Sequence, residues 1–186
     1  MLVKKRNGKH EEVSFDKILN RMKSLSYGDE FTYKLDIDPT IIAQKVCSEI
    51  YDGVKTSELD QLASEISISL YSSNPDYSIL ASRILVSNHH KNTEGSFMKK
   101  TKMLFNAITN ERSTPLINEA YHDFVVDNKE EIESVIDYQR DYDFDFFGLK
   151  TLEKSYLYKV NKVIVERPQD MIMRVALSIH RNDIGK

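Results

Sequence analysis

The spacing of hydrophobic residues changes several times along the chain, and each spacing predicts a different element of structure. Residues 2–6 and 10–13 flank Asn7-Gly8, a dipeptide that tolerates the positive φ values of a type I′ turn, so we expect an opening β-hairpin. From residue 14 the apolar side chains recur every three or four positions, which is typical of helices with one buried face. The four helices predicted there run from about Phe15 to Leu25, from Pro39 through Ile50, from about Thr56 through Leu70, and from Pro75 to Lys91.

Local signals for helix ends support this order. Asp38-Pro39 and Asn74-Pro75 each combine a capping residue with a proline, whose fixed φ suits the first helical position. Thr56 and Ser57 are expected to cap the third helix, and Gly53 to end the second. The first half is therefore predicted to be a hairpin followed by four short helices.

Residues 92–96, Asn-Thr-Glu-Gly-Ser, interrupt the periodicity, and we place a domain boundary there, between residues 1–92 and residues 93–186. Further helices are expected at about 96–109, 115–127 and 128–136, with a hairpin around Asn161-Lys162 and a last helix from Pro168. The expected fold class is thus mainly α, with a minor β part (α+β).

Aspartate and aromatic residues alternate over residues 141–147, which predicts an extended segment with one packed face. The final residues, 181–186, come directly after the last predicted helix. We therefore expect the chain to be part of a longer polypeptide.

Composition narrows the classes of partner and the chemistry. Lysine and arginine number 26 against 29 aspartates and glutamates, and this near balance gives no reason to expect nucleic acid or membrane as a partner. Cys47 is the single cysteine, which excludes a disulfide framework, a multi-cysteine zinc site and a thiol pair within these 186 residues. With no signal peptide or membrane span expected, a reducing cytoplasmic setting is predicted.

The hairpin is the first candidate site, because four basic residues surround its turn: Lys4, Lys5, Arg6 and Lys9. Together with exposed backbone amides they suit a polyphosphate. The alternative is a solvated edge strand that its lysines protect from aggregation. Neither the P-loop pattern nor the dinucleotide fingerprint is present, so any mononucleotide site has another geometry.

Other candidate residues favour structural roles. His89-His90-Lys91 ends the fourth helix, where positive charge suits the dipole, and adjacent histidines point about 100° apart, so no metal site is predicted. Cys47 is expected to be a half-buried filler. The carboxylates of residues 137–145 lack the glycine and terminal glutamate of a calcium-binding loop.

Short motifs that occur in the same order in one protein family cover essentially the whole chain. In the first half they are Val3-x-Lys5-Arg6-x-Gly8, Val13-x-Phe15-Asp16-Lys17-Ile18, Tyr51-x-Gly53-Val54-x-Thr56-x-Glu58-Leu59-Asp60, Pro75-Asp76-Tyr77-x-Ile79-Leu80-Ala81-x-Arg83-Ile84 and Val86-Ser87-Asn88-x-His90-Lys91. In the second half they are Phe147-Gly148-x-Lys150-Thr151-Leu152-Glu153-x-Ser155-Tyr156-Leu157 and Glu166-Arg167-Pro168-Gln169-x-Met171. Together these motifs resemble the amino-terminal region of the large, catalytic subunit of class I ribonucleoside-diphosphate reductases, of the eukaryotic type also found in large DNA viruses.

The resemblance implies that residues 1–92 form an ATP-cone, a hairpin-plus-helices module where ATP activates the enzyme and dATP inhibits it. It implies that residues 93–186 begin the helical region before the catalytic barrel. Mg²⁺ is then expected to come with the nucleotide rather than be held by the chain. The nucleotide-binding residues that the resemblance implies are Lys5, Arg6, Glu11, Glu12, Val13, Ser14, Phe15, Asp16, Lys17, Thr56, Asp60, Asn88 and Lys91.

Among these, Asp60 is expected near the ribose, and its alternative role is that of an acid near a helix start. The catalytic cysteines of the family lie beyond this sequence, so no catalytic residue is assigned and the isolated chain is expected to be inactive. Implied partners are the rest of the large subunit, further copies of it in a homo-oligomer, and a small radical-generating subunit. The family's Asp at position 7 is replaced by Asn7, and the loop 29–37 is slightly expanded.

Two alternatives remain. Cone modules also occur in a transcription repressor beside a zinc ribbon, but that ribbon needs two cysteine pairs and this sequence has one cysteine. A stand-alone nucleotide-sensing regulator, or the fragment of a split gene, is the other.

Overall fold

The computed structural model describes residues 1–109 and 112–180. Contacts divide the chain into two compact units, Met1–Asn88 with Phe144–Phe147, and His89–Asp143 with the residues from Gly148 onward. Helices dominate both units and the strands are short, so the prediction of a mainly α fold is confirmed. Residues 181–186, on which the expectation of a longer polypeptide rested, lie outside the described residues.

The first unit begins with a small sheet whose strand order is β2-β1-β3. Strands β1 (Leu2–Lys4) and β2 (His10–Glu12) pair antiparallel, which confirms the predicted hairpin. Strand β3 (Val54–Lys55) joins β1 in parallel and was not predicted. Val3 and Val54 are register partners and both are buried, so one face of the sheet contributes to the core.

The turn of this hairpin is not of the predicted type I′. Such a turn needs positive φ at both central residues, whereas Gly8, with φ of 82°, has it and Asn7 does not. The Gly8 N–H donates to the Lys5 carbonyl at 2.9 Å, and the Lys5 N–H to the Lys9 carbonyl at 2.8 Å. A three-residue connection ending in left-handed glycine, the next commonest hairpin design, accounts for this pattern.

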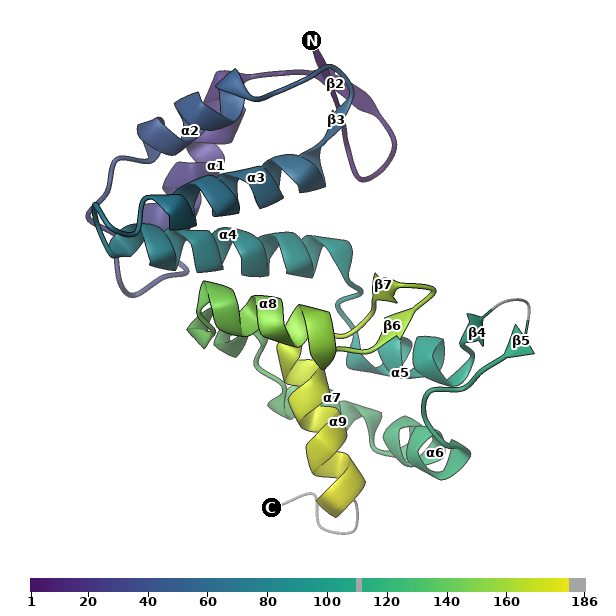
Figure 1. Ribbon diagram of the computed structural model, residues 1–186. Coiled ribbons are helices and arrows are strands. Elements are labelled where there is room, and N and C mark those ends of the chain that lie inside the picture. Colours follow the sequence, from purple (N-terminus) through teal and green to yellow (C-terminus); the bar gives the residue numbers. More distant parts are fainter. Residues whose placement is uncertain (110–111, 181–186) are drawn as a thin grey trace. The chain divides into compact units, whose positions relative to one another are not determined.

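Four helices follow, as predicted: α1 (Phe15–Tyr27), α2 (Pro39–Ser48), α3 (Thr56–Ser69) and α4 (Asp76–Asn92). In Figure 1 the strands β2 and β3 lie at one end of the helices of this unit. The Ser14 hydroxyl caps α1 by accepting from the Lys17 N–H, and the Asp38 carboxylate caps α2 by accepting from the Thr40 N–H at 2.8 Å. These caps show why the local signals located the helix starts correctly.

The prediction that Thr56 and Ser57 cap α3 is wrong, because both already lie within the helix. Lys55 occupies the cap position, and its N–H donates to the Glu58 carboxylate at 3.3 Å. Strand β3 therefore passes directly into α3, so that Lys55 ends one element and precedes the next. Helix α2 also ends at Ser48, before the predicted Ile50.

The core of the first unit consists of apolar side chains from each helix. Its fully or nearly fully buried members are Met22, Leu25, Ile42, Ala43, Val46, Ala63, Ile66, Leu80, Ala81 and Ile84. Buried Arg83 lies beneath the loop before α2, where it donates to the Tyr33 carbonyl at 2.7 Å and covers the Phe31 ring at 3.9 Å. Burial lowers the pKa of Arg83. The loop that contains Phe31 and Tyr33 is therefore fastened to α4.

The second unit contains α5 (Phe97–Phe105), α6 (Glu119–Asp127), α7 (Lys129–Val135), the 3₁₀ helix η1 (Tyr138–Asp143) and α9 (Pro168–His180). Helix α8 (Phe146–Ser155) precedes the hairpin of β6 (Lys159–Val160) and β7 (Val163–Ile164). Asn161 and Lys162 have φ of 50° and 68° in the turn, so the predicted hairpin is confirmed. A second short hairpin, β4 (Ile108–Thr109) with β5 (Arg112–Ser113), was not expected.

The extended conformation predicted for residues 141–147 is wrong. This segment ends η1 and begins α8. Asp141 is fully buried, and polar partners compensate for its burial: its carboxylate accepts from the Gln169 N–H at 3.0 Å and lies 2.6 Å from His90 Nε2. Alternating acids and aromatics thus reflect specific polar contacts in a helical segment rather than the two faces of a strand.

The core of the second unit combines an apolar cluster with a buried ion pair. The cluster comprises Phe97, Met98, Tyr121, Val125, Ile132 and Leu177. Lys100 donates to Asp170 at 2.5 Å, and the hydroxyl of Tyr138 donates to the same carboxylate at 2.6 Å. Burial lowers the pKa of Lys100 in opposition to the attraction of Asp170. None of the described helices is long and apolar enough to cross a membrane.

Candidate functional site

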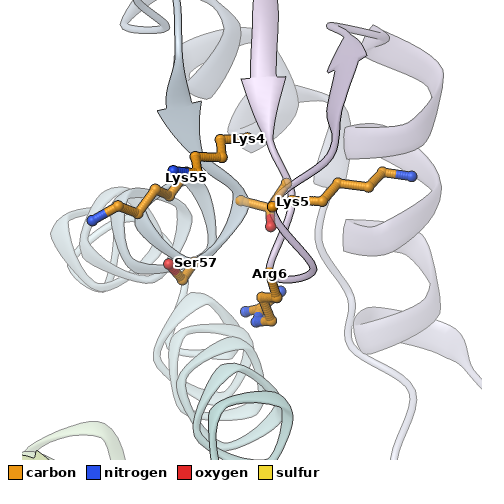
Figure 2. Close-up of a pocket in the computed structure, with 7 residues that line it drawn as sticks. Lys4, Lys5, Arg6, Lys55 and Ser57 are labelled. Atoms are coloured by element: carbon orange, nitrogen blue, oxygen red, sulfur yellow. The ribbon is translucent and has the colours of Figure 1, made fainter.

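A pocket of about 220 Å³ opens in the first unit, between the hairpin turn and the start of α3 (Figure 2). The residues lining it are Lys4, Lys5, Arg6, Gly8, Lys55, Thr56 and Ser57. Four of these residues are cationic and none is acidic. The positive charge expected at the hairpin is therefore gathered around one cavity, although Lys9 does not contribute to its lining.

Lys5 forms one cationic arm of the site. Its ammonium pairs with the carboxylate of Glu11, and the ammonium of Lys17 on α1 pairs with the other oxygen of the same group. Hydrogen bonds from Lys17 first, and from Lys5 second, lower the pKa of Glu11 from 4.5 to about 2. Three of the predicted residues therefore form one cluster, in which an acid holds two lysines near each other.

Arg6 leads to a second, more buried cluster. Its guanidinium donates to Asp60 at 3.2 Å and to the side-chain oxygen of Asn88. Arg21 on α1 donates to the same Asp60 carboxylate at 2.6 and 3.1 Å, and to Ser87 at 3.2 Å. The Asp60 carboxylate accepts from both guanidinium groups and therefore balances their charge. It is buried, so these ion pairs have little access to water.

Asn88 connects this cluster to the pocket. Its side-chain nitrogen donates to the Ser57 carbonyl at 3.2 Å, while its oxygen accepts from Arg6. Ser57 lines the pocket in the first turn of α3. The end of α4 thus fixes both the arginine of the hairpin and the start of α3.

The structure does not bring all the predicted residues into the pocket lining. Those among them that line it are Lys5, Arg6 and Thr56. Glu11, Lys17, Asp60 and Asn88 contact these residues or their neighbours. The others lie outside the lining, in β2, in or just before α1, or at the end of α4: Glu12, Val13, Ser14, Phe15, Asp16 and Lys91.

Sequence reasoning missed several residues of the site. Lys55 and Ser57 line the pocket, and Arg21 and Ser87 complete the polar cluster around Asp60. Arg21 lies four residues after Lys17 on α1, a spacing that places both on one helix face. That spacing was a usable signal, whereas the partnership with Asp60 depends on the fold.

The remaining candidates have structural roles. Cys47 is half-buried, and burial raises the pKa of its thiol, in agreement with the prediction of a filler. His89 lies 3.0 Å from Glu153 and 2.9 Å from the Glu166 carbonyl, so the interpretation as a helix-end charge was incomplete. Within residues 1–109 and 112–180, no group of three or more histidines, cysteines or acids is arranged to hold a metal ion.

Comparison with known proteins finds two family models that match separate parts of the chain. Residues 1–92 match the family described as "ATP cone domain", and residues 142–185 match "Ribonucleotide reductase, all-alpha domain". The chain is 48% identical over 187 residues to the ribonucleoside-diphosphate reductase large subunit of Arabidopsis thaliana. It is 50% identical over 186 residues to that of Vaccinia virus (strain Copenhagen), and 46% identical over 187 residues to that of Danio rerio.

These matches include nearly all of this chain but only part of each relative. They cover 99%, 99% and 100% of this chain in the three comparisons, and 22%, 24% and 23% of the respective relatives. The chain therefore spans less than a quarter of the length of these relatives.

Proposed function

Since the chain belongs to the family of ribonucleoside-diphosphate reductase large subunits, we propose that residues 1–92 bind adenine nucleotides and regulate a reductase. ATP is the activating effector in this proposal and dATP the inhibiting one. Residues 93–186 start the helical region that connects this domain to the catalytic part. The similarity continues far beyond residue 92, which disfavours a stand-alone nucleotide-sensing regulator.

The single observation that carries the proposal is the acid-free cationic pocket at the hairpin turn. A nucleoside triphosphate carries several negative charges, and charge-assisted hydrogen bonds from ammonium and guanidinium groups are the strongest that a protein offers to phosphate. A pocket of this charge in an ATP cone domain suits a nucleotide better than a neutral ligand. Protection of an edge strand from aggregation does not suffice to explain these charges, because β1, which carries Lys4, is the central strand of the sheet.

The predicted residues then divide into three roles. Lys5, Arg6 and Lys91 contact phosphates, the segment from Glu11 to Lys17 contacts the adenine, and Thr56 and Asp60 complete the site from α3. Asp60 acts mainly through Arg6, since its carboxylate already accepts from two arginines. Phosphate would compete with Glu11 for Lys5 and Lys17, so binding loosens that cluster. Any Mg²⁺ arrives bound to the nucleotide.

The reaction of the longer protein is the reduction of ribonucleoside diphosphates to deoxyribonucleoside diphosphates. It would be carried out in the cytoplasm by an oligomer of large subunits with a small radical-generating subunit. That chemistry needs a thiyl radical and a redox-active cysteine pair, while Cys47 is the only cysteine here. The 186-residue chain alone should therefore yield no deoxynucleotide when assayed with a small subunit and a dithiol.

Titration calorimetry on the 186-residue chain tests the proposal. ATP and dATP should bind competitively, and both affinities should fall as salt rises, because several cations meet one polyphosphate. Replacing Lys5 or Lys91 with alanine should each weaken binding by about 1–3 kcal/mol, the scale of one charge-assisted hydrogen bond. Cys47→Ser is the matched control, and it should leave both affinities unchanged. Absence of ATP and dATP binding would contradict the proposal.

A further inference from the structure

Two lysines stand in register on neighbouring strands of the first sheet. Lys4 on β1 and Lys55 on β3 are parallel-strand partners, directly after the buried pair Val3 and Val54. Since successive side chains point to opposite faces, both lysines lie on the face away from the core. Figure 2 shows them extending on the same side, whereas Lys5 extends in the other direction, toward α1.

The pairing of these two like charges is expected to lower the stability of the sheet. Like charges on paired strand positions repel, and a neutral residue at either place would avoid the penalty. Lys55 is partly compensated by Glu58, whose carboxylate lies 3.3 Å from its ammonium. Lys4 has no carboxylate within ion-pair distance in the part of the chain that the structure describes. Protection of an edge strand explains Lys55 on β3 but not Lys4 on the central strand.

The start of α3 lies beside the two lysines. Thr56 and Ser57 line the same pocket and form the first turn of a 14-residue helix, where backbone N–H groups and the helix dipole favour an anion. Asn88 fixes this turn through its bond to the Ser57 carbonyl. The lysine pair and the first turn of α3 therefore supply complementary donors to one cavity.

The size of the cavity indicates which part of a nucleotide fits. Its volume of about 220 Å³ is below the roughly 300–1,000 Å³ that pockets enclosing a whole drug-sized ligand occupy. A phosphate chain fits such a space, while the nucleoside would extend beyond it. The acid-free lining agrees with a strongly anionic occupant.

We propose that Lys4, Lys55 and the first turn of α3 form a subsite for the terminal phosphates of a nucleoside triphosphate. The subsite should make the domain selective for triphosphates over monophosphates, because a monophosphate has a single phosphate group to share between the two lysines. The inference rests on the proposed function in placing a nucleotide at this pocket. It adds Lys4 and Lys55 to the nucleotide-binding residues that the resemblance implies, and of these two only Lys4 was noted in the basic hairpin turn.

Calorimetry on the 186-residue chain with ATP, AMP and inorganic tripolyphosphate tests the subsite. Lys4→Gln and Lys55→Gln should each weaken ATP and tripolyphosphate about tenfold, the effect of one lost charge-assisted contact, and change AMP less than about twofold. The matched control is Lys9→Gln, which removes the same charge from the same turn outside the pocket lining. It should change all three affinities less than about twofold.

Two results would overturn the subsite: equal weakening of ATP and AMP by the pocket variants, or an effect of Lys9→Gln as large as theirs. Thermal melting without ligand checks that the variants fold, and Lys4→Gln should melt higher than the wild type because repulsion is relieved. If the wild type binds tripolyphosphate but not ATP, and both Lys4→Gln and Lys55→Gln weaken the binding of tripolyphosphate, the proposed function fails and the anion subsite stands. If it binds neither, both fail.

Discussion

Arg21 on α1 and Asp60 on α3 form a two-point ion pair, with Nε 2.6 Å from Oδ1 and Nη2 3.1 Å from Oδ2. The pair joins residues 39 positions apart in the sequence. Asp60 is buried and also accepts from Arg6, so one carboxylate balances two cations. This arrangement makes Asp60 more than an acid that complements the helix dipole.

Asp60→Asn should therefore lower the free energy of unfolding by about 2 kcal/mol, because both guanidinium groups lose their counter-charge in a poorly hydrated place. Urea denaturation of the 186-residue chain measures this loss. Glu58→Gln removes an exposed charge from the first turn of the same helix and should cost less than about 1 kcal/mol. Equal losses in the two variants would reduce Asp60 to a dipole effect.

The same Asp60→Asn variant should alter effector discrimination. Arg6 lines the pocket, and the substitution weakens its ion pair with Asp60 on α3. ATP and dATP differ only at the ribose 2′-hydroxyl, so a shift of Arg6 should affect the two nucleotides unequally. The ratio of their two affinities should change, and in a full-length enzyme dATP should inhibit less strongly. An unchanged ratio together with unchanged inhibition would show that Asp60 serves stability alone.

The carboxylate of Glu11 should titrate far below its ordinary range. Its pKa in the folded chain is about 2, against 4.5, so its bonds to Lys17 and Lys5 stabilise the fold above pH 4.5. That contribution should be lost progressively as the pH falls from 4.5 toward 2. Carbon-detected NMR titration measures the midpoint, and Lys17→Gln should raise it more than Lys5→Gln, since Lys17 contributes most. A wild-type midpoint near 4.5 would refute the bridge.

A buried tyrosine and a half-buried one provide an opposed pair of predictions. The Tyr121 hydroxyl has no hydrogen-bond partner among the described residues, and burial raises its pKa. Tyr121→Phe should therefore increase stability by about 1 kcal/mol, because an unsatisfied buried hydroxyl is removed. Tyr138→Phe should instead cost about 1–3 kcal/mol, since its hydroxyl bonds Asp170 at 2.6 Å and Lys100 at 3.0 Å. Melting curves would reverse this interpretation if Tyr121→Phe were the more damaging change.

Elements with a local signal were predictable from the sequence. The caps Ser14 and Asp38, and the proline that begins α9, act within a few residues of themselves, so their effect is visible in the sequence alone. The turn at Asn161-Lys162 is of the same kind. Strand β3 escaped prediction because two residues carry no periodicity, and its pairing with β1 joins positions about 50 residues apart.

The site shows the same limit. Lys5, Arg6 and Thr56 were identified through the resemblance, and the basic turn was visible in the sequence before it. Lys55 gave no signal, because its significance comes from the register that sets it beside Lys4. The segment 141–147 misled because alternation of polar and aromatic residues fits a strand, while burial of Asp141 against His90 and the Gln169 N–H decided for a helical one.

Helix α4 has a consequence for how this module can be exchanged during evolution. Asn88 belongs to the first compact unit, whereas the next two residues, His89 and His90, have their partners Glu153 and Asp141 in the second. Along the chain, the boundary between Asn88 and His89 therefore falls within helix α4 and not in a linker. A cone transplanted with all of α4 would carry two histidines deprived of their acids, so recombination must keep or replace both sides together.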